Sequence, residues 1–299
     1  MDIRKLVKSR KLRDAMRYSL SVLPSGIYLR LYYAAMTGRR LHLKNPKTYN
    51  EKLQWLKLHD KRAEYTQLAD KIAVRQHIEK VLGPGYTFPI LGVWKRFDEI
   101  DFSALPNEFV LKCNHDSGSA HVIKDKTSMT PDQMQELRKY FNKRVKTNFY
   151  YAGREYPYKD IPRRIFAEKL MKPENENELS IRDYKFFCFN GEPKLLLLAS
   201  GRSGGQHAED YFDMDFKHLP EVRNGWEPSV VPPEKPECFE QMKQMAAKLS
   251  AGIPQVRMDF YEIDGKPYFG EYTFFSGGGF ELFKPEEWEQ RLGDWIRLG

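Results

Sequence analysis

Two acidic residues near the C-terminus are spaced so that a β-hairpin would bring them together. If the hairpin loop is Asp264-Gly265-Lys266, Asp259 lies directly opposite Glu271, and Arg257 lies opposite Thr273. Neighbouring carboxylates repel each other unless a cation lies between them, and Mg²⁺ prefers carboxylate oxygens. The spacing therefore indicates a magnesium site. A two-residue loop would instead place the pair on opposite faces and leave two unrelated surface acids.

Lys112 ends a short predicted strand and is followed by a loop of small residues. The backbone N–H groups of such a loop can bind phosphate oxygens, and the lysine ammonium adds positive charge. The loop positions that matter are Ser117, Gly118 and Ser119. Their spacing differs from that of a P-loop, and an ordinary turn is the alternative.

A second pair of cations lies on a predicted helix. Lys71 and Arg75 are four residues apart, near a helix N-terminus where anions are favoured, and Asp70 is the predicted N-cap. Glu168 lies on a later strand and can pair with an amide-like edge such as the amino group of adenine. Taken singly, these residues also suit a capped surface helix and an edge strand.

Further charged residues follow along the chain. Asp183 and Lys185 are two residues apart on a predicted strand and so share one face. Arg202 follows an apolar strand and could hold a phosphate or a substrate carboxylate, or be an ordinary loop arginine. Asp213 and Asp215 form a D-x-D pattern, which metal-dependent glycosyltransferases use to hold a nucleotide sugar. This pattern supports an alternative function.

Composition excludes several classes of protein. The chain has 299 residues, 41% of them hydrophobic, which is enough for one large domain or two smaller ones. Its three cysteines, Cys113, Cys188 and Cys238, are far apart. This argues against a disulfide framework or a cysteine zinc site and favours a cytosolic setting. We find neither an apolar run that could span a membrane nor the pattern of a signal peptide.

Positive charge is concentrated in residues 1–47. This segment holds twelve Lys or Arg and two Asp, whereas residues 48–299 have a net charge of −2, within a total of +8. A nucleic-acid enzyme usually has a basic body as well, so nucleic acid is not an expected partner. The arm is amphipathic, which suits an anionic membrane face, a polyanionic substrate or a helix packed on the body.

Strands and helices alternate at first, and hairpins dominate the second half. The predicted helices are 27–37, after a turn at Pro24-Ser25-Gly26, and 48–58, 70–82, 131–146 and 285–298. The predicted strands are 108–112, 121–123, 164–171, 183–190, 194–200, 256–263 and 267–274, with hairpin turns at Asn190-Gly191 and Asp264-Gly265. This order favours an α+β or mixed α/β architecture.

Taken together and in this order, the pieces resemble an ATP-grasp enzyme. More narrowly, they resemble the TupA-like branch, named for teichuronopeptide biosynthesis. The stretches that carry the resemblance are LHLKNPKTYNEKLQWLKLHD, LADKIAVRQHI, LPNEFVLKCNHDSGSAHVIKDK, DYKFFCFNGEPKLLLL and VRMDFYEIDGKPYFGEYTFFSGGG. The resemblance implies an ATP-grasp fold, in which ATP lies between a small lid subdomain and an α+β platform.

The resemblance also implies roles for individual residues. The residues that would hold ATP are Lys71, Lys112, Ser117, Gly118, Ser119, Glu168, Leu170 through its backbone, and Asp183. Those that would hold Mg²⁺ are Asp259, Glu271 and Thr273, the last at a position where the superfamily often has Asn. The cationic residues expected to act during the reaction are Arg202, Arg257 and Lys185.

The implied reaction is a two-step ligation. A substrate carboxylate attacks the γ-phosphate of ATP to give an acylphosphate, and an amine then displaces phosphate. The named family implies that an amino acid or peptide is joined to a uronic-acid polysaccharide or its lipid-linked precursor, in the cytoplasm or peripherally on the inner face of the membrane. The expected divisions are a basic helical arm (1–47), a region of helices or mixed α and β structure (48–108), the lid (109–172) and the platform with the metal site (173–299).

Overall fold

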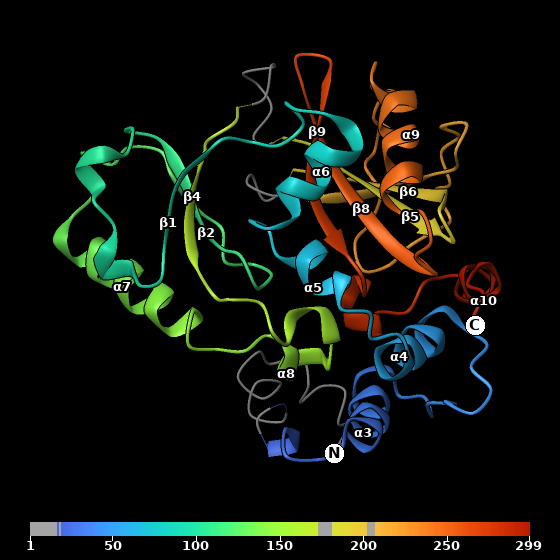
Figure 1. Cartoon of the computed structure of the whole chain (residues 1–299). Helices are drawn as coiled ribbons and strands as arrows, with labels where there is room; N and C mark the ends of the chain where they lie inside the picture. Colours follow the sequence, from blue (N-terminus) through green and yellow to red (C-terminus); the bar gives the residue numbers. More distant parts are fainter. Residues whose placement is uncertain (1–16, 18, 173–180, 202–206) are drawn as a thin grey trace.

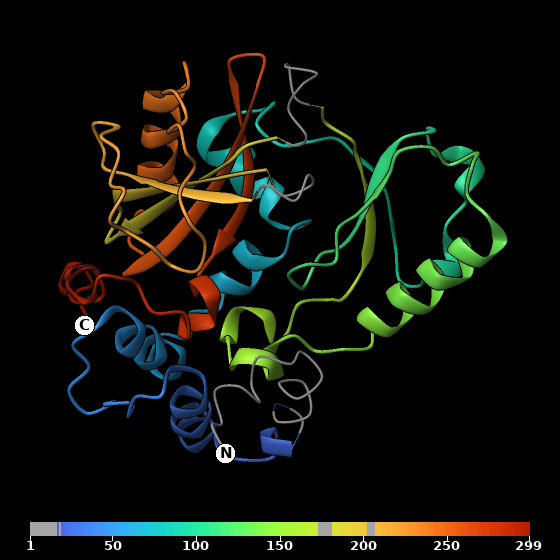
Figure 2. The same ribbon diagram turned by 180° about the vertical axis from the view of Figure 1, so that it is seen from behind.

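The computed structural model describes residues 17, 19–172, 181–201 and 207–299 and shows two antiparallel sheets with helices around them. The smaller sheet and its helix form one lobe, the larger sheet forms a second, and a helical layer lies across the base (Figure 1). The view from behind shows the same division (Figure 2). The predicted α+β class is confirmed. Most of the predicted basic helix at the N-terminus lies outside the described residues.

The bounds of the helices and strands are as follows. The helices are α3 (Ser25–Thr37), α4 (Tyr49–His59), α5 (Glu64–Ala69), α6 (Val74–Leu82), α7 (Pro131–Arg144), α8 (Tyr150–Gly153), α9 (Phe239–Leu249) and α10 (Glu286–Trp295). The strands are β1 (Ile90–Trp94), β2 (Phe109–Cys113), β3 (His121–Ile123), β4 (Ile165–Lys169), β5 (Asp183–Phe189), β6 (Glu192–Ser200), β7 (Ala208–Phe212), β8 (Gln255–Ile263) and β9 (Lys266–Thr273).

The smaller sheet has the order β1-β4-β2-β3. Its outer face packs on α7: Phe109 and Leu111 of β2, Ile165 and Ala167 of β4, and Phe141 of α7 share one buried cluster. Because successive strand residues point to opposite faces, the residues between these apolar ones face the other way. They include the charged side chains of the site described below.

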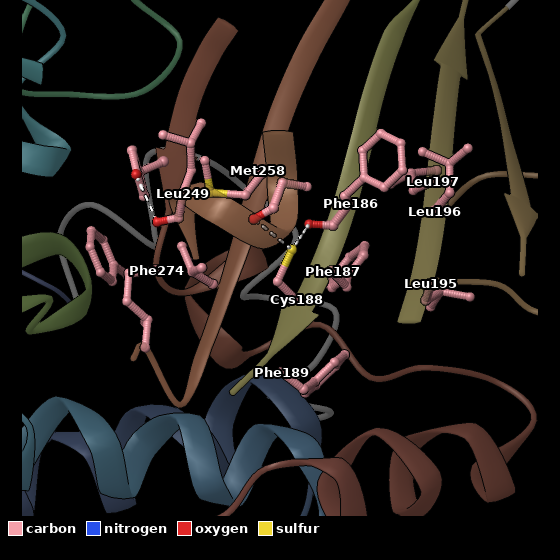
Figure 3. Close-up of a cluster of buried hydrophobic side chains, with 14 of the residues drawn as sticks. Phe186, Phe187, Cys188, Phe189, Leu195, Leu196, Leu197, Leu249, Met258 and Phe274 are labelled. Carbon is pink, nitrogen blue, oxygen red and sulfur yellow. Dashed lines mark hydrogen bonds between the residues drawn. The ribbon is translucent and has the colours of Figure 1, made fainter. Parts of the chain in front are cut away.

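The larger sheet has the order β7-β6-β5-β8-β9, and its central strand β5 is buried along its whole length. Phe186 contacts Phe239 of α9 on one face of the sheet, and Phe187 contacts Tyr49 of α4 on the other. Figure 3 shows the resulting cluster, in which side chains of β5 lie between those of β6 and Met258 of β8. Covering on both faces explains why β5 and β6 are nearly continuous apolar runs.

The hairpin β8–β9 differs from the prediction in its loop. Asp264 and Gly265 alone form the turn, with φ of 53° and 66°, so Ile263 pairs with Lys266. The predicted three-residue loop is therefore wrong. A β-bulge then shifts the register between Asp259 and the next residue of β8, and Gly270 is the extra residue on β9.

The bulge restores the pairing that the shorter turn would have removed. Asp259 lies opposite Glu271, and Arg257 lies opposite Thr273, as predicted. Gly270 suits the bulge because a Cβ there would lie only 3.0 Å from the carbonyl oxygen of Asp259. The shorter turn and the bulge thus cancel, and both carboxylates face the same side of the sheet.

The helical base supports the segment that follows β9. The side chain of Asn50, at the start of α4, donates to Glu289 of α10 at 2.9 Å. Farther along α4, Lys57 is 2% exposed and donates to the carbonyl of Gly278, in the 3₁₀ turn Ser276–Gly279. These contacts fix the chain directly after Thr273.

We expect Gly270→Ala to destabilise the protein by about 1–2 kcal/mol, because the added Cβ crowds the Asp259 backbone and the bulge cannot relax. The measurement is urea unfolding of the purified variant. Gly26→Ala in α3 is the control, since its Cβ would meet only the flexible end of Arg30 at 3.4 Å. Equal stability of the Gly270 variant and the wild type would show that the bulge does not require glycine.

Candidate active site

A pocket of about 280 Å³ lies between the inner face of the smaller sheet and strands β5, β8 and β9 of the larger one. Helix α6 lies on the larger lobe, on the side toward the smaller sheet, in both views (Figures 1 and 2). The charged residues lining the pocket are Lys71, Arg75, Lys112, Lys185, Asp116, Glu168, Asp183, Asp259 and Glu271. Its apolar lining includes Val74, Phe88, Phe166, Tyr261 and Phe269.

The floor of the pocket is a row of paired charges, here called the charged ladder, that runs across strands β5, β8 and β9. Lys185 of β5 pairs in register with Asp259 of β8, and its Nζ lies 2.6 Å from Asp259 Oδ2. The same Nζ lies 3.2 Å from Asp183 Oδ2. The predicted shared face of Asp183 and Lys185 is confirmed. All three side chains are almost fully buried, so each charge needs its partner.

Arg257 approaches Asp259 from the same strand, two residues away. Its Nε and Nη2 each donate to one Asp259 oxygen at 2.8 Å. It also donates to the hydroxyls of Ser276 and Thr273 at 2.8 and 3.2 Å. Arg257 therefore holds Asp259 in place from behind, and the structure does not place it among the residues that line the pocket.

Glu271 forms the outer end of the ladder. Its Oε2 accepts a hydrogen bond from Lys71 Nζ at 2.7 Å, and its Oε1 accepts one from Thr273 Oγ1 at 3.3 Å. Burial alone would raise the pKa of Glu271, but Lys71, with Lys185 and Arg257, lowers it to about 2. Burial opposes the charge on Lys71 as well, yet Glu271 raises the pKa of Lys71 above its ordinary value.

The smaller sheet contributes Glu168, held between two cations. Lys112 Nζ lies 2.5 Å from Glu168 Oε1, and Arg75 Nη2 lies 2.8 Å from Oε2. Arg75 also donates to the carbonyl of Phe88. Phe166, two residues before Glu168 on β4, presents its ring on the same face. A flat apolar surface with hydrogen-bonding groups at its edge results.

The loop between β2 and β3 closes one side of the pocket. Arg144, at the end of α7, binds Asp116 Oδ2 at 2.7 Å and the carbonyl of Ser117 at 2.7 Å. The hydroxyl of Tyr140 donates to the carbonyl of Gly118 at 3.1 Å. Ser119 Oγ accepts from the backbone N–H of Cys113 at 2.9 Å, so this serine helps to shape the loop.

The charge of the pocket suits a divalent cation. Five carboxylates and four cations line it, so a polyphosphate alone would meet more negative than positive groups. Within the described residues, no three His, Cys, Asp or Glu side chains gather as a preformed metal site. Asp259 and Glu271 are a carboxylate pair, which is what Mg²⁺ uses when phosphates and water complete its coordination.

The structure brings most of the predicted site residues together, leaves three aside and does not describe a fourth. Lys71, Lys112, the loop Ser117–Ser119, Glu168, Asp183, Lys185, Asp259 and Glu271 all line the one pocket. Arg202 lies outside the described residues. Leu170 follows β4, and neither it, Arg257 nor Thr273 is among the described residues that line the pocket.

The D-x-D pattern has a structural role in the loop after β7. Asp213 Oδ1 accepts hydrogen bonds from the backbone N–H groups of Asp215 and Lys217, at 3.0 and 2.8 Å. Such bonds are typical of a turn. Neither Asp213 nor Asp215 lines the pocket between the sheets.

Several pocket residues were missed by the sequence analysis. Phe166 and Tyr261 could have been found by stepping two residues along the strand from Glu168 and Asp259. Asp116 had no such signal, because its place depends on Arg144, which is 28 residues away.

Comparison with known proteins gives the family. A sequence model described as TupA-like ATP-grasp matches residues 51–297, which is most of the chain. The protein belongs to the TupA-like ATP-grasp family. The resemblance seen in the sequence is therefore confirmed. No curated protein sequence matches the chain.

Several solved structures are similar to this chain at low sequence identity. D-alanine–D-alanine ligase from Bacillus anthracis, complexed with ATP, is 14% identical over 70% of this chain and 55% of that one, with a TM-score of 0.42. The Helicobacter pylori D-alanine–D-alanine ligase is 13% identical over 83% and 69%, with a TM-score of 0.45. The ATP-grasp ligase PsnB, complexed with a minimal precursor, Mg and ADP, is 10% identical over 75% and 57%, with a TM-score of 0.39. The chain thus spans little more than half of the B. anthracis ligase.

We expect Glu271→Gln to lower the free energy of unfolding by about 2 kcal/mol at pH 7, because Lys71 loses its charged partner. The pKa of Glu271 is lowered from 4.5 to about 2, so its contribution is fully present above pH 4.5 and fades as the pH falls toward 2. Urea unfolding at pH 7, 4 and 3 should therefore show a shrinking difference from the wild type. The exposed Glu287→Gln is the control. A difference that stays constant across this range would contradict the pairing.

Proposed function

We propose that this protein is an ATP-dependent carboxylate–amine ligase that uses Mg²⁺. One observation carries the proposal: Lys71, Lys112 and Lys185 converge on the same pocket as the carboxylate pair Asp259 and Glu271. ATP-grasp ligases are ATP-dependent enzymes that form carbon–nitrogen bonds, and the family match supports the same chemistry here.

Each wall of the pocket suits one part of ATP. The ring surface of Phe166 and the side chain of Val74 suit the purine, with Glu168 at the polar edge. Lys71 and Lys112 suit the phosphates, and the backbone of the Ser117–Ser119 loop can close over them. Asp183 lines the pocket at β5 and suits the ribose hydroxyls.

Asp259 and Glu271 are the residues that would hold Mg²⁺, which supplies positive charge to neutralise the phosphate oxygens. Arg257 and Lys185 hold Asp259 in a fixed orientation through direct contacts, and Thr273 donates a hydrogen bond to Glu271. Lys71, now paired with Glu271, can exchange this partner for a phosphate oxygen when the nucleotide binds.

The reaction needs positioning and charge neutralisation more than covalent catalysis. The oxygen of a substrate carboxylate attacks the γ-phosphorus, and ADP leaves with the electron pair of the broken P–O bond. An amine then attacks the acyl carbon, phosphate leaves, and the amine loses a proton. The Ser117–Ser119 loop would exclude water from the acylphosphate during these steps.

The substrate class follows from the family and from charge. We propose that an amino acid or peptide is joined to a uronic-acid polysaccharide or to a lipid-linked precursor of it, in the cytoplasm or at the inner face of the membrane. The basic character of residues 1–47 supports an acidic acceptor.

Thermal stability in the presence of nucleotides tests the pocket. We expect Mg-ATP at millimolar concentration to raise the Tm of the wild type, and we expect Asp259→Asn and Glu271→Gln to lose this increase because the metal loses a ligand. Asp264→Asn, in the turn of the same hairpin, should respond like the wild type. Stabilisation only by a UDP-sugar with Mn²⁺ would instead support the glycosyltransferase alternative based on Asp213 and Asp215.

Release of ADP tests the reaction itself. In a screen of amino acids with uronic-acid acceptors, ADP release should require both a carboxylate and an amine, because the acylphosphate turns over only when the amine arrives. Lys112→Ala should reduce the rate about 100-fold or more through lost phosphate contacts, whereas the exposed Lys139→Ala should not. ADP release at the full rate without any amine would contradict the ligase proposal.

A further inference from the structure

A second, larger cavity of about 870 Å³ lies in the helical base, between α3 and the chain that leads to α4. It shares no lining residue with the pocket between the sheets. Figure 1 shows α3 and this connection at the bottom of the molecule, away from the smaller sheet. The basic side chains that line the cavity are Arg30, Arg39, Arg40, Lys44 and Lys47.

Most of the positive charge of this cavity has no acidic partner among the residues that the structure describes. The sequence has no acidic residue between Asp14 and Glu51. Arg39 pairs with Glu286 at 3.0 Å. In the part of the chain that the structure describes, the side chains of Arg40, Lys44 and Lys47 have no ion-pair partner. These three exposed cations are available to an external anion.

Glu51, the acid among the described lining residues, is already fully used by the loop. Its Oε1 lies 2.7 Å from His42 Nδ1, and its Oε2 accepts from the backbone N–H groups of Lys47 and Thr48 at 3.0 and 3.2 Å. Burial would raise the pKa of Glu51, but these hydrogen bonds lower it, so the carboxylate is ionised and engaged. The bonds shape the loop and leave its cations pointing outward.

Alternation along the loop fixes its orientation. Leu41 and Leu43 are 5% and 9% exposed and belong to the buried cluster beneath α3, whereas His42, between them, and Lys44, after them, are exposed. The loop is therefore anchored by its apolar residues, and presenting its polar residues costs little conformational entropy.

An apolar stripe on α3 continues from the cavity. Ile27 and Leu31 are 48% and 49% exposed and lie one helical turn apart. Arg30 and Ala34 are on the same helical face and line the cavity, so the stripe and the cations form one surface. Just before α3, Val22 is 86% exposed.

We propose that this surface, comprising Ile27, Leu31 and the basic rim of the cavity, binds an anionic phospholipid bilayer. The cations would meet the headgroup phosphates, and the two apolar side chains would enter the interfacial layer. A soluble polyanion would satisfy the cations but would leave the adjoining apolar stripe in water. A bilayer accounts for both features. This inference does not depend on the proposed ligase activity.

The proposed contact is peripheral. Helix α3 has 13 residues, and no helix in the described part of the chain has the length and apolar character needed to cross a bilayer. The helix would therefore lie along the membrane surface.

Vesicle co-sedimentation of the full chain tests the proposal. The wild type should bind vesicles of phosphatidylglycerol and phosphatidylcholine but not phosphatidylcholine alone, and added salt should weaken binding. The variant Arg40→Glu/Lys44→Glu/Lys47→Glu should bind about tenfold more weakly or worse. The control, Lys139→Glu/Lys143→Glu/Lys146→Glu, makes the same charge change at exposed positions on and just after α7 and should bind within about twofold of the wild type.

The variant Ile27→Ser/Leu31→Ser separates a bilayer from a soluble polyanion. It should lose vesicle binding while it retains the circular dichroism spectrum of the wild type and its affinity for soluble polyglucuronate. The proposal would be overturned if the α7 control lost vesicle binding equally, or if the Ile27→Ser/Leu31→Ser variant kept it. If that variant kept vesicle binding and the protein also bound polyglucuronate tightly, the surface would be a glycan site. The rise in Tm with Mg-ATP is measured for each variant without vesicles, so that failure of the ligase proposal is seen separately.

Discussion

Asp259 has almost no access to solvent, and its burial is tolerable because two cations contact it directly, Lys185 and Arg257. Removing one partner from such a buried pair lowers the free energy of unfolding by about 3–5 kcal/mol. The same requirement extends outward through Glu271 to Lys71. The floor of the pocket is thus one compensated array of charges, and the rest of the fold serves to hold its members at these distances.

Both sheets use the alternation of strand residues to combine a core with a site. On one face of β5, Phe187 and Phe189 pack against α4 and α10, and farther along the same face Lys185 opens into the pocket. On β4, Ile165 packs toward α7, whereas Glu168 faces the pocket. Stability and chemistry therefore share the same strands, and a shift of one residue in register would exchange the two faces.

The sequence predicted the parts of this arrangement that follow from local spacing. The shared face of Asp183 and Lys185 and the hairpin turns required only a period of two and Asn-Gly or Asp-Gly signals. Strand β1 was not predicted. The bulge at Gly270 could not be predicted from the sequence, because it depends on how β9 packs. The pairing of Arg144 with Asp116 was equally inaccessible, since it joins a helix end to a loop across the smaller lobe.

The most direct test is a crystal structure of the protein with a non-hydrolysable ATP analogue and Mn²⁺, which has a measurable anomalous signal. The account predicts an anomalous peak between the carboxylates of Asp259 and Glu271, with Lys71 moved from Glu271 to a phosphate oxygen. A nucleotide bound elsewhere, or an intact contact between Lys71 and Glu271 with no metal beside it, would contradict the account.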